Sequence, residues 1–455
     1  MNTINQPETP SIGIVVLGCD KNTADAERFA GMITTNPAGG ITVRGVTPNP
    51  DAAPPLDAVV IYTCSFIHDA KAESVETILA WCLRRTETGN PRRIYVVGCL
   101  SEQHSKALQD EIPEVDGFFG LQDMDALAST LAPGADAAAE HGARTRLEST
   151  PYAFLKIADG CNHACTFCVI PSIKGPFRSR PREALLTEAR ALVEGGAREV
   201  TLVAQDTTGY GRDLYDDYRL PQLLRDLCDI PGDFWIRCLY CYPGGITDAL
   251  TEQLATQPKI TPYLDIPLQH MAPNLLKAMK RPAPEQDVGA LIAKLRAAIP
   301  NLALRTTMMV GFPGETEDDH QRMLDMVREI AFEWLGAFVF CPEEGTVAAT
   351  LPNPVPETEA QARLDALMEL QADITAQFNV RREGRRARVL VEHFDADLNA
   401  WSARSTAEAP EVDGAVLIHP HPTLCAGTFR DVVFVNASLY DITARVIDGQ
   451  ECAPL

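Results

Sequence analysis

Three cysteines stand close together in one loop, in the order Cys161-x-x-x-Cys165-x-x-Cys168 (the loop trio). The loop directly follows the apolar run Phe154–Ala158, which predicts a β-strand. Three thiolates at this spacing can ligate three irons of a cubane iron–sulfur cluster, whose complete set of protein ligands would be four. The fourth iron would then be open to a small molecule. A structural zinc site is the alternative, but zinc needs a fourth ligand and usually shows paired C-x-x-C spacing, and we interpret His163 inside the loop as incidental.

A second set of three cysteines (the N-terminal trio) is spread over a longer stretch of chain. Each member follows an apolar run that predicts a strand: Cys19 after Ile12–Leu17, Cys64 after Ala58–Thr63 and Cys99 after Ile94–Gly98. In an open parallel sheet, the carboxyl ends of the strands lie along one edge, where ligands bind. The three thiols are therefore expected to converge there and to hold a second, incompletely ligated cluster. Buried structural cysteines are the alternative, but such residues would seldom all take that position.

The elements that must position these cysteines begin with two α/β blocks. In the first, the strands alternate with helix-compatible stretches such as Ala70–Arg84, which predicts an open parallel sheet. The second has six strand candidates, too few for a closed eight-stranded barrel, so we predict an open, partial (βα)6 barrel leading into a long helix, Glu357–Arg382. The six candidates are Phe154–Ala158, Glu199–Ala204, Phe234–Leu239, Tyr263–Ile266, Leu304–Val310 and Gly336–Phe340.

From about Arg388 the pattern changes to five short strands punctuated by turn residues such as Asp413-Gly414, which predicts a small OB-like β-barrel. These strands are Val389–Glu392, Ala400–Arg404, Ala415–Ile418, Asp431–Asn436 and Asp441–Val446. We therefore expect an α/β protein of three domains. The expected segments are the parallel-sheet domain at residues 10–130, a linker at 131–147, the partial barrel at 148–385 and the small β-barrel at 386–455.

Length, composition and charge narrow the class of protein. A chain of 455 residues exceeds one ordinary domain. It has no run of eighteen apolar residues and no basic-then-apolar start, so we expect no membrane span and a cytosolic location. Thirteen cysteines in a cytosolic enzyme are not expected to form a disulfide framework. The net charge of −22 argues against a generic nucleic-acid coat, and it fits either a basic partner or a simple need for solubility.

The segment Gly160–Pro171, with its three cysteines after the first barrel strand, resembles the radical S-adenosylmethionine (SAM) superfamily. This resemblance implies that the open iron chelates SAM and that the reduced cluster cleaves it to a radical. With Leu17–Asn22, Thr63–Ile67 and Gly98–Leu100, the chain is similar to the methylthiotransferases over nearly its whole length. Its third block, which contains Arg404–Gly414, is similar to their TRAM domain.

The resemblance to the methylthiotransferases implies two 4Fe–4S clusters and two SAM molecules, with the six cysteines as cluster ligands and catalytic residues. It also implies an electron donor such as flavodoxin or ferredoxin, and we expect a monomer. In the superfamily, the loops after the barrel strands hold SAM. The residues that follow the second and fifth strands are therefore the expected SAM-binding residues: Gln205, Asp206, Gly311, Gly314 and Glu315.

Three other polar residues or patches near the barrel mouth have two interpretations each. His270 follows the fourth strand and either contacts the cofactor or is a satisfied loop residue. Lys174, Arg178 and Arg180 either neutralise a carboxylate of SAM or of the substrate, or form a solvated charge run. The pair Cys238-x-x-Cys241 imitates a redox motif, but it falls in a predicted strand, and we interpret both thiols as structural.

Two branches of the methylthiotransferases differ in substrate. One modifies isopentenyl-adenosine in tRNA, and the other modifies an aspartate β-carbon in the small-subunit ribosomal protein numbered twelve. The local sequence resembles the ribosomal-protein branch, and the transfer of a methylthio group to that aspartate is the implied function, with the tRNA as the alternative substrate. The segments that carry this resemblance are Ile157–Cys161, Ala204–Gly211, Leu239–Pro243 and Tyr263–His270.

The charge of the third block favours the same branch. From Arg388 to Leu455 there are four arginines, no lysine and ten acids, a net charge of −6. An RNA-binding barrel should be basic, whereas an acidic one suits a basic ribosomal protein. We expect Glu408, Glu411 and Asp413 to lie in one exposed loop that contacts this partner.

Two other classes of protein explain only part of the sequence. A non-enzymatic RNA-binding protein would account for the third block but not for six clustered thiols. A radical SAM enzyme with a purely electron-transferring second cluster would account for the thiols but not for the TRAM-like block.

Overall fold

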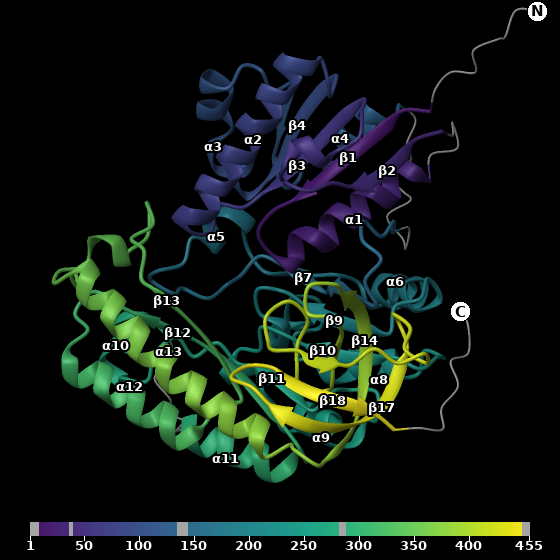
Figure 1. The fold of residues 1–455 in the computed structure, drawn as a ribbon. Helices are drawn as coiled ribbons and strands as arrows, with labels where there is room; N and C mark the ends of the chain where they lie inside the picture. The colour runs from purple at the N-terminus through teal and green to yellow at the C-terminus, as the bar shows by residue number, and fades with distance from the viewer. Residues whose placement is uncertain (1–8, 36–39, 134–143, 282–287, 448–455) are drawn as a thin grey trace, which may run out of the picture.

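The structure is a computed structural model, which describes residues 9–35, 40–133, 144–281 and 288–447. These residues form three parts that pack against one another: an N-terminal sheet, a partial barrel and a small C-terminal barrel (Figure 1). This architecture confirms the predicted fold class. Most of the expected linker, residues 134–143, lies outside the described residues. None of the helices in the described ranges is long and apolar enough to cross a bilayer.

The N-terminal part is a five-stranded parallel sheet with helices on both faces. Its elements are β1 (Ser11–Val16), α1 (Asp20–Thr34), β2 (Thr42–Gly45), β3 (Ala58–Thr63), α2 (His68–Thr88), β4 (Arg93–Gly98), α3 (Cys99–Glu111), β5 (Gly117–Phe119) and α4 (Met124–Leu131). The strand order is β2-β1-β3-β4-β5. Helices α1 and α4 pack on one face, and α2 and α3 pack on the other, so the central strands are apolar on both sides. The edge strands β2 and β5 escaped the sequence prediction because they are short and partly exposed.

The middle part is an open barrel of six parallel strands. They are β6 (Tyr152–Lys156), β9 (Glu199–Val203), β10 (Trp235–Cys238), β11 (Tyr263–Asp265), β12 (Ala303–Val310) and β13 (Trp334–Val339). Strands β6, β9 and β10 pair in one group, and β11, β12 and β13 pair in another. The groups meet where the Cys241 amide donates to the Asp265 carbonyl at 2.8 Å. No pairing in the described part of the chain joins β6 to β13, so the barrel is open, as predicted.

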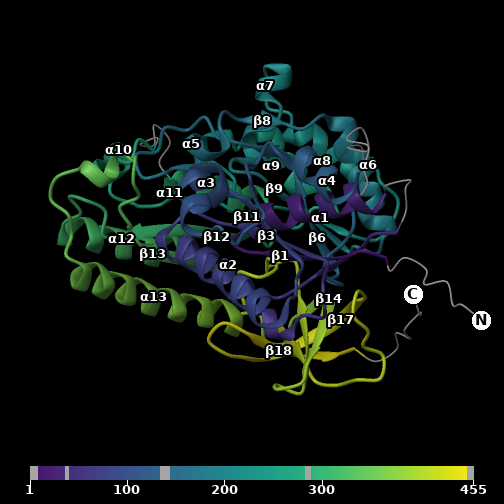
Figure 2. The same ribbon diagram turned by 90° about the horizontal axis from the view of Figure 1, so that it is seen from above.

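Helices cover the outside of this barrel, and a small hairpin lies at its mouth. The hairpin pairs β7 (Ala158–Asp159) with β8 (Arg178–Ser179). The helices are α5 (Ile170–Lys174), α6 (Arg182–Glu194), α7 (Arg212–Tyr215), α8 (Leu220–Cys228), α9 (Asp248–Thr256), α10 (Pro273–Ala278), α11 (Val288–Ala298), α12 (Glu317–Ile330) and α13 (Glu357–Val380). Apolar residues of α6, α8, α9, α11 and α12 pack on the strands in one continuous core. Helix α13 then leads to the C-terminal barrel (Figure 2).

The C-terminal part is a closed β-barrel in the order β14-β15-β16-β18-β17. Its strands are β14 (Arg386–Asp395), β15 (Ala400–Arg404), β16 (Val416–Ile418), β17 (Phe429–Ala437) and β18 (Ile442–Val446). Alternating side chains such as Val389, Val391, Val432 and Phe434 fill its interior. The five strands confirm the small OB-like barrel that the alternating pattern predicted.

Buried ionic contacts attach the C-terminal barrel to the partial barrel, and they correct one expectation. Glu408 and Asp413 do not lie on an exposed surface. Glu408 is 1% exposed and accepts from the Arg382 guanidinium at 2.5 Å, while Asp413 accepts from the Tyr263 hydroxyl at 2.6 Å. Of the three acids only Glu411 is exposed, and it accepts from the Tyr152 hydroxyl at 2.9 Å. The prediction was wrong because a sequence does not show which loop acids meet arginines of a neighbouring domain.

Candidate active site

The N-terminal trio lies at one edge of the parallel sheet, as the strand pattern predicted. Thr63 and Gly98 are paired in the register of β3 and β4, so Cys64 and Cys99 follow two adjacent strand ends. Strand β1 continues the pairing on the other side, since the Leu17 amide donates to the Tyr62 carbonyl at 2.9 Å. The three cysteines are therefore carried by three neighbouring strand ends, β1, β3 and β4.

Contacts around the trio explain why a short polar residue and a glycine stand close to Cys19 in the sequence. The buried Asn22 amide donates to the carbonyls of Leu17 at 2.8 Å and of Thr63 at 3.2 Å, which fastens the end of β1 to the end of β3. Gly18 has a φ of +89°, and a Cβ there would lie 3.0 Å from the Cys64 sulfur and 2.6 Å from its Cβ. A larger residue at this position would displace the thiol.

The thiols of the N-terminal trio are partly withdrawn from water. Cys64 and Cys99 are 8% and 7% exposed, and Cys19 is more open. Burial raises the pKa of the Cys64 thiol and raises the pKa of Cys99 to about 12. These two thiols stay protonated at neutral pH unless a metal cation supplies the charge that favours the thiolate. Neither thiol therefore has the lowered pKa of a reactive nucleophile.

The loop trio lies between β7 and α5, in a loop that is held together by its own backbone hydrogen bonds. The Cys161 amide donates to the Gly175 carbonyl at 3.2 Å, and the Cys168 amide donates to the Cys165 carbonyl at 3.2 Å. Burial raises the pKa of Cys161 to about 11 and that of Cys168 to about 12. The loop thus holds three thiols in one compact turn at the mouth of the barrel.

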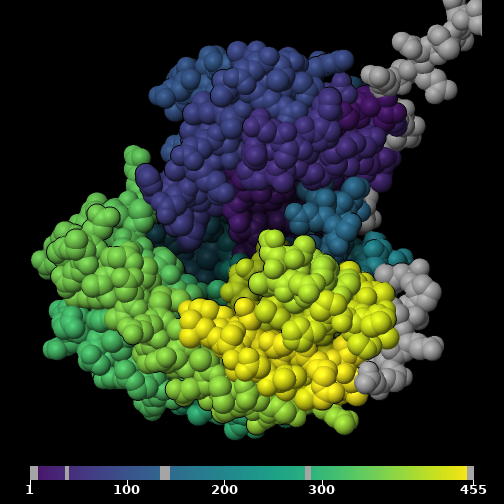
Figure 3. All heavy atoms as spheres, in the orientation of Figure 1, coloured from purple at the N-terminus to yellow at the C-terminus, as the bar shows by residue number. Residues whose placement is uncertain are grey.

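The two trios meet across one interface. Cys99 packs in an apolar cluster with Val169 and Ile173, which belong to the segment directly after Cys168. Figure 3 shows a recess between the purple N-terminal domain and the green helices of the barrel, with teal residues at its floor. The segment after the loop trio therefore packs directly on a residue of the N-terminal trio.

A stacked group of side chains beside the loop trio was missed by sequence reasoning. The His163 ring stacks on the Tyr242 ring, with centroids 3.8 Å apart, and its Nε2 lies 2.7 Å from the Asp206 carboxylate. Arg281 covers the same tyrosine at 4.6 Å and donates to the Cys165 sulfur at 3.9 Å. His163 is therefore not incidental. The signal was present, since Tyr242 follows the third strand, but the contacts come from three separate loops.

The expected SAM-binding residues after β9 occupy the mouth of the barrel. Asp206 is bonded within its own region, to His163, to the Thr208 hydroxyl at 2.6 Å and to the Gly209 amide at 3.1 Å. Its neighbour Gln205 has a buried side-chain oxygen without a hydrogen-bond partner in the described ranges. The same holds for the Thr207 hydroxyl and for the Gln269 side-chain oxygen, which follows β11. Buried polar atoms of this kind are normally satisfied by a ligand or by ordered water, and the ammonium and hydroxyl groups of SAM are donors that fit them.

The Gly311–Glu315 turn after β12 is stabilised by a side chain of the turn itself. The buried Glu315 carboxylate accepts from the Gly311 amide, and it also lies 3.3 Å from both the Arg363 guanidinium and the His270 Nε2. A Cβ on Gly311 would lie 2.7 Å from Ala360, whereas Gly314 has open space beside it. Glu315 thus shapes the turn, while Gly314 leaves room for close approach of a ligand. Both ring nitrogens of His270 have partners within the protein, so His270 is a structural loop residue and not a cofactor contact.

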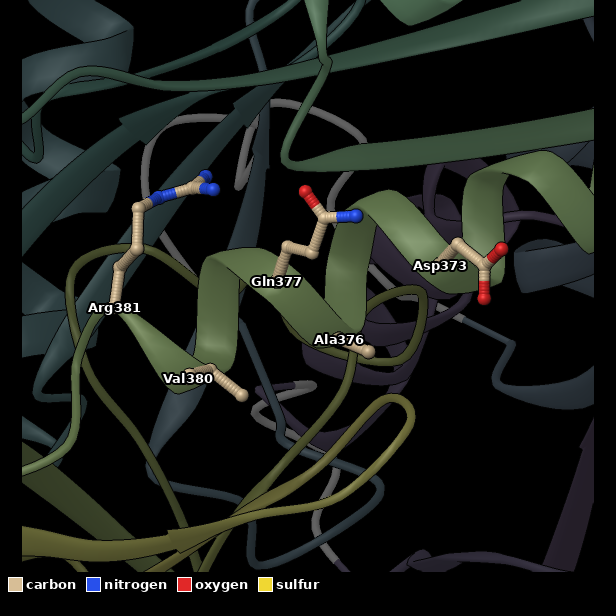
Figure 4. A pocket seen from close by; sticks show the side chains of 5 residues that line it. All are labelled: Asp373, Ala376, Gln377, Val380 and Arg381. Carbon is tan, nitrogen blue, oxygen red and sulfur yellow. The ribbon is translucent and has the colours of Figure 1, made fainter.

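Of the remaining candidates, Arg180, Cys238 and Cys241 have structural contacts. Arg180 is bonded to Glu188 at 2.6 Å, and Arg178 is exposed. Cys238 and Cys241 are fully buried in the barrel core, although Cys241 follows β10 instead of lying in it. A hollow of about 410 Å³ is lined by α13 and the residue after it, and it offers no thiol (Figure 4). It lies apart from the chemistry that the cysteines can support.

In the described ranges, no three His, Cys, Asp or Glu side chains converge on a point where one metal ion could bind. The thiols of a cubane site need not converge in this way, because each ligates a different iron. A donor set of three thiols therefore fits a cluster with one open iron at each trio.

Family models match all three parts of the chain. Residues 155–327 match the radical SAM superfamily, residues 11–120 match a family described as uncharacterized protein family UPF0004, and residues 384–447 match the TRAM domain. Each match falls within a different one of the three parts that the structure describes.

Solved structures with a similar fold support the architecture alone. The radical S-adenosylmethionine methyltransferase TsrM from Kitasatospora setae, solved with cobalamin and a [4Fe-4S] cluster, has a TM-score of 0.54 at 13% identity. The match covers 92% of this chain and 80% of that chain. A second structure of the same protein, with tryptophan and a SAM analogue, has a TM-score of 0.53 at 13% identity and covers 91% and 81%.

Curated relatives are similar along almost the whole chain. The ribosomal protein uS12 methylthiotransferase RimO of Desulforamulus reducens is 40% identical, over 96% of this chain and 99% of its own length. RimO proteins of Moorella thermoacetica and Fervidobacterium nodosum are 41% and 42% identical, each over 96% of this chain and over 99% and 98% of their own lengths. With three matching domains and relatives of this similarity, the chain belongs to the RimO family of radical SAM methylthiotransferases.

Proposed function

We propose that this protein transfers a methylthio group to the β-carbon of an aspartate in ribosomal protein uS12, using two 4Fe–4S clusters and two SAM molecules. The proposal rests on one observation above all: Cys99 of the N-terminal trio packs against Val169 and Ile173, in the segment that directly follows Cys168 of the loop trio. The proposed substrate is taken from the curated relatives, because they are named as uS12 methylthiotransferases. We also propose domain limits at residues 10–130, 148–385 and 386–455.

Each trio has its own role in this proposal. Cys161, Cys165 and Cys168 would hold the cluster to which SAM binds, and the buried oxygens after β9 and β11 would orient SAM. Together the cluster and SAM would supply the radical chemistry that removes a hydrogen atom from the substrate. Cys19, Cys64 and Cys99 would hold the second cluster and so supply the site for the sulfur to be transferred.

The chain's own residues then orient and confine the reaction. The stack of His163, Tyr242 and Arg281 fixes the loop trio against the barrel mouth. The buried surroundings of Cys64 and Cys99 exclude water from the second site. No side chain is required as a general base, since the step at the substrate carbon is a hydrogen-atom transfer.

The second candidate substrate, isopentenyl-adenosine in tRNA, is disfavoured by the relatives and by charge. Even with Glu408 and Asp413 buried, the C-terminal barrel lacks the excess of lysine and arginine that phosphate binding needs. We further propose that an electron donor such as flavodoxin or ferredoxin reduces the loop-trio cluster, and that the protein acts as a monomer in the cytoplasm.

Iron content and product label test this function together. Anaerobically reconstituted protein should bind about eight irons, twice the content of one cubane. Replacing all three cysteines of either trio by alanine should halve that number, whereas replacing Cys238 and Cys241 by alanine should leave it unchanged. Wild-type protein that saturates at four irons would contradict the two-cluster assignment.

The substrate is tested by direct competition. The enzyme is given SAM with a labelled methyl group, a reductant, uS12 and isopentenylated tRNA in one reaction. Label should appear on uS12. Label on the tRNA alone would overturn the ribosomal-protein assignment and leave the radical SAM chemistry intact.

A further inference from the structure

One buried cation of the barrel domain lies without a full set of partners. Lys174 ends α5, and only 4% of its side chain is exposed. Its ammonium has no hydrogen-bond partner in the described ranges. The Asp159 carboxylate is 3.6 Å away, which is an ionic contact beyond hydrogen-bond distance. A buried ammonium with three unused donors is costly unless a ligand meets them.

The nearby carboxylates receive their hydrogen bonds from another lysine. The Lys156 ammonium lies 2.9 Å from Asp159 and 2.5 Å from Asp25. These two acids are therefore hydrogen-bonded without Lys174, although its charge still helps to balance theirs. The hydrogen-bond donors of its ammonium are left for a group that no described residue supplies.

Residues next to Lys174 in the chain pack against the N-terminal trio. The residue before it, Ile173, packs against Cys99 together with Val169. Helix α5 also packs on α3, the helix that begins at Cys99. The start of the same loop is fastened next to Lys174, where the Cys161 amide bonds to the Gly175 carbonyl. Lys174 thus sits between the two trios.

The electrostatics of the site agree with this placement. Burial raises the pKa of Cys99 and of Cys64, and the charge of Lys174 acts against that rise at both thiols. Burial lowers the pKa of Lys174, but its acidic neighbours Asp159 and Asp25 and the thiols of Cys99 and Cys19 raise it overall. The ammonium is therefore within electrostatic range of all three members of the N-terminal trio.

We propose that Lys174 is a positioning residue for the N-terminal trio, whose ammonium donates to the anionic sulfur centre bound there and balances its charge. This inference rests on the proposed function, because it assumes that the trio holds a cluster. It adds that the N-terminal domain does not complete its own site. The cation comes from the loop that ligates the other cluster, so docking of the two domains is part of the site.

The test isolates the N-terminal cluster in the full chain. In a parent variant, Cys161, Cys165 and Cys168 are all replaced by alanine, which leaves one cluster to load. Lys174→Met and Lys174→Arg are then compared with Lys106→Met in this parent. Lys106 is an exposed lysine on α3, so its variant controls for the loss of a lysine in the same region. Iron content and the midpoint reduction potential, followed by electron paramagnetic resonance, are measured for each protein.

The expected result is a shift of potential that follows charge. Reduction adds a negative charge to the cluster, and a nearby cation that donates to its sulfur stabilises the reduced form. Lys174→Met should therefore make the potential more negative. Lys174→Arg should restore most of the shift, and Lys106→Met should leave the potential of the parent unchanged.

The outcomes separate this inference from the proposed function. An unchanged potential in fully loaded Lys174→Met would overturn the role of Lys174 while the two-cluster assignment stands. If Lys174→Met loses iron but keeps its circular dichroism spectrum, restored iron in Lys174→Arg supports the role, and absence of restoration overturns it. A parent variant that binds no iron would instead contradict the proposed second cluster itself.

Discussion

Glu199, in the second strand of the partial barrel, lies 2.9 Å from the Arg404 guanidinium of the C-terminal barrel, and both side chains are buried. Glu199 also lies 2.7 Å from Arg237 on the adjacent strand. Arg404 in turn bonds Glu392 on its own barrel at 2.7 Å. Two acids and two arginines thus form one buried network, which joins the catalytic barrel to the C-terminal barrel.

Removing one member of this network should destabilise the protein strongly. Arg404→Ala leaves the Glu199 carboxylate with one arginine fewer in a buried site, and breaking a buried pair in this way typically costs about 3–5 kcal/mol. The loss should appear in the free energy of unfolding by urea. Arg445→Ala, at an exposed position of β18, is the matched control and should change stability by less than about 0.5 kcal/mol. Equal effects of the two variants would contradict the network's role.

The same network should make stability depend on acid. Although burial opposes ionisation, Arg237 and Arg404 hold the pKa of Glu199 at about 2, against an ordinary value of 4.5. A lowered pKa stabilises the folded state fully above about pH 5, and that contribution, on the order of 3 kcal/mol, is lost as the pH falls toward 2. Unfolding free energies of wild type and Glu199→Gln should therefore converge between pH 5 and pH 3. Parallel pH profiles would rule this out.

The N-terminal trio should be needed before any radical forms. Without reductant, SAM should yield S-adenosylhomocysteine and an acid-labile methylthiol, because a methyl group is transferred to sulfur held by that trio. Chromatography of the quenched reaction measures both products. The variant with Cys19, Cys64 and Cys99 replaced by alanine should form neither. Cys82→Ala, a buried thiol of α2 that lies off the sheet edge, should retain both. Normal rates in the triple variant would show the assignment to be wrong.

The ring of Tyr242 should matter more than its hydroxyl. The ring stacks between the His163 imidazole and the Arg281 guanidinium. Loss of one aromatic contact and one cation–π contact corresponds to about 1–2 kcal/mol, or roughly tenfold in rate. Tyr242→Leu should therefore slow reductive SAM cleavage about tenfold, while Tyr242→Phe should stay near wild type. Rates that fall equally in both variants would instead implicate the hydroxyl.

Much of the fold could be predicted because its central strands are continuous apolar runs. The predicted strand Ala58–Thr63 coincides with β3, and Ala400–Arg404 coincides with β15. The exposed strand β2 has no such run. It forms because it pairs with β1, and its local sequence alone does not predict a strand. For the same reason, the six thiols could be located from the strand ends that precede them.

The contacts between distant loops could not be predicted. The stack of His163 and Tyr242 joins loops that are 79 residues apart in the chain, and no local pattern records which ring meets which. The segment that contains Glu408 and Asp413 has the amino-acid composition of an exposed turn. Their burial depends on Arg382 and Arg305, which belong to the other side of an interface that forms only in the folded protein.

The pairing of Thr63 with Gly98 has a consequence for how this site tolerates insertions and deletions. Because Cys64 and Cys99 each follow a member of that pair, the strand ends that carry them keep the separation of neighbouring strands, about 4.8 Å, whatever the packing of their side chains. Changes of length in the loops before β3 or β4 should leave this separation intact. A single residue inserted within β4 would move Cys99 out of step with Cys64 and turn its neighbours to the opposite face of the sheet.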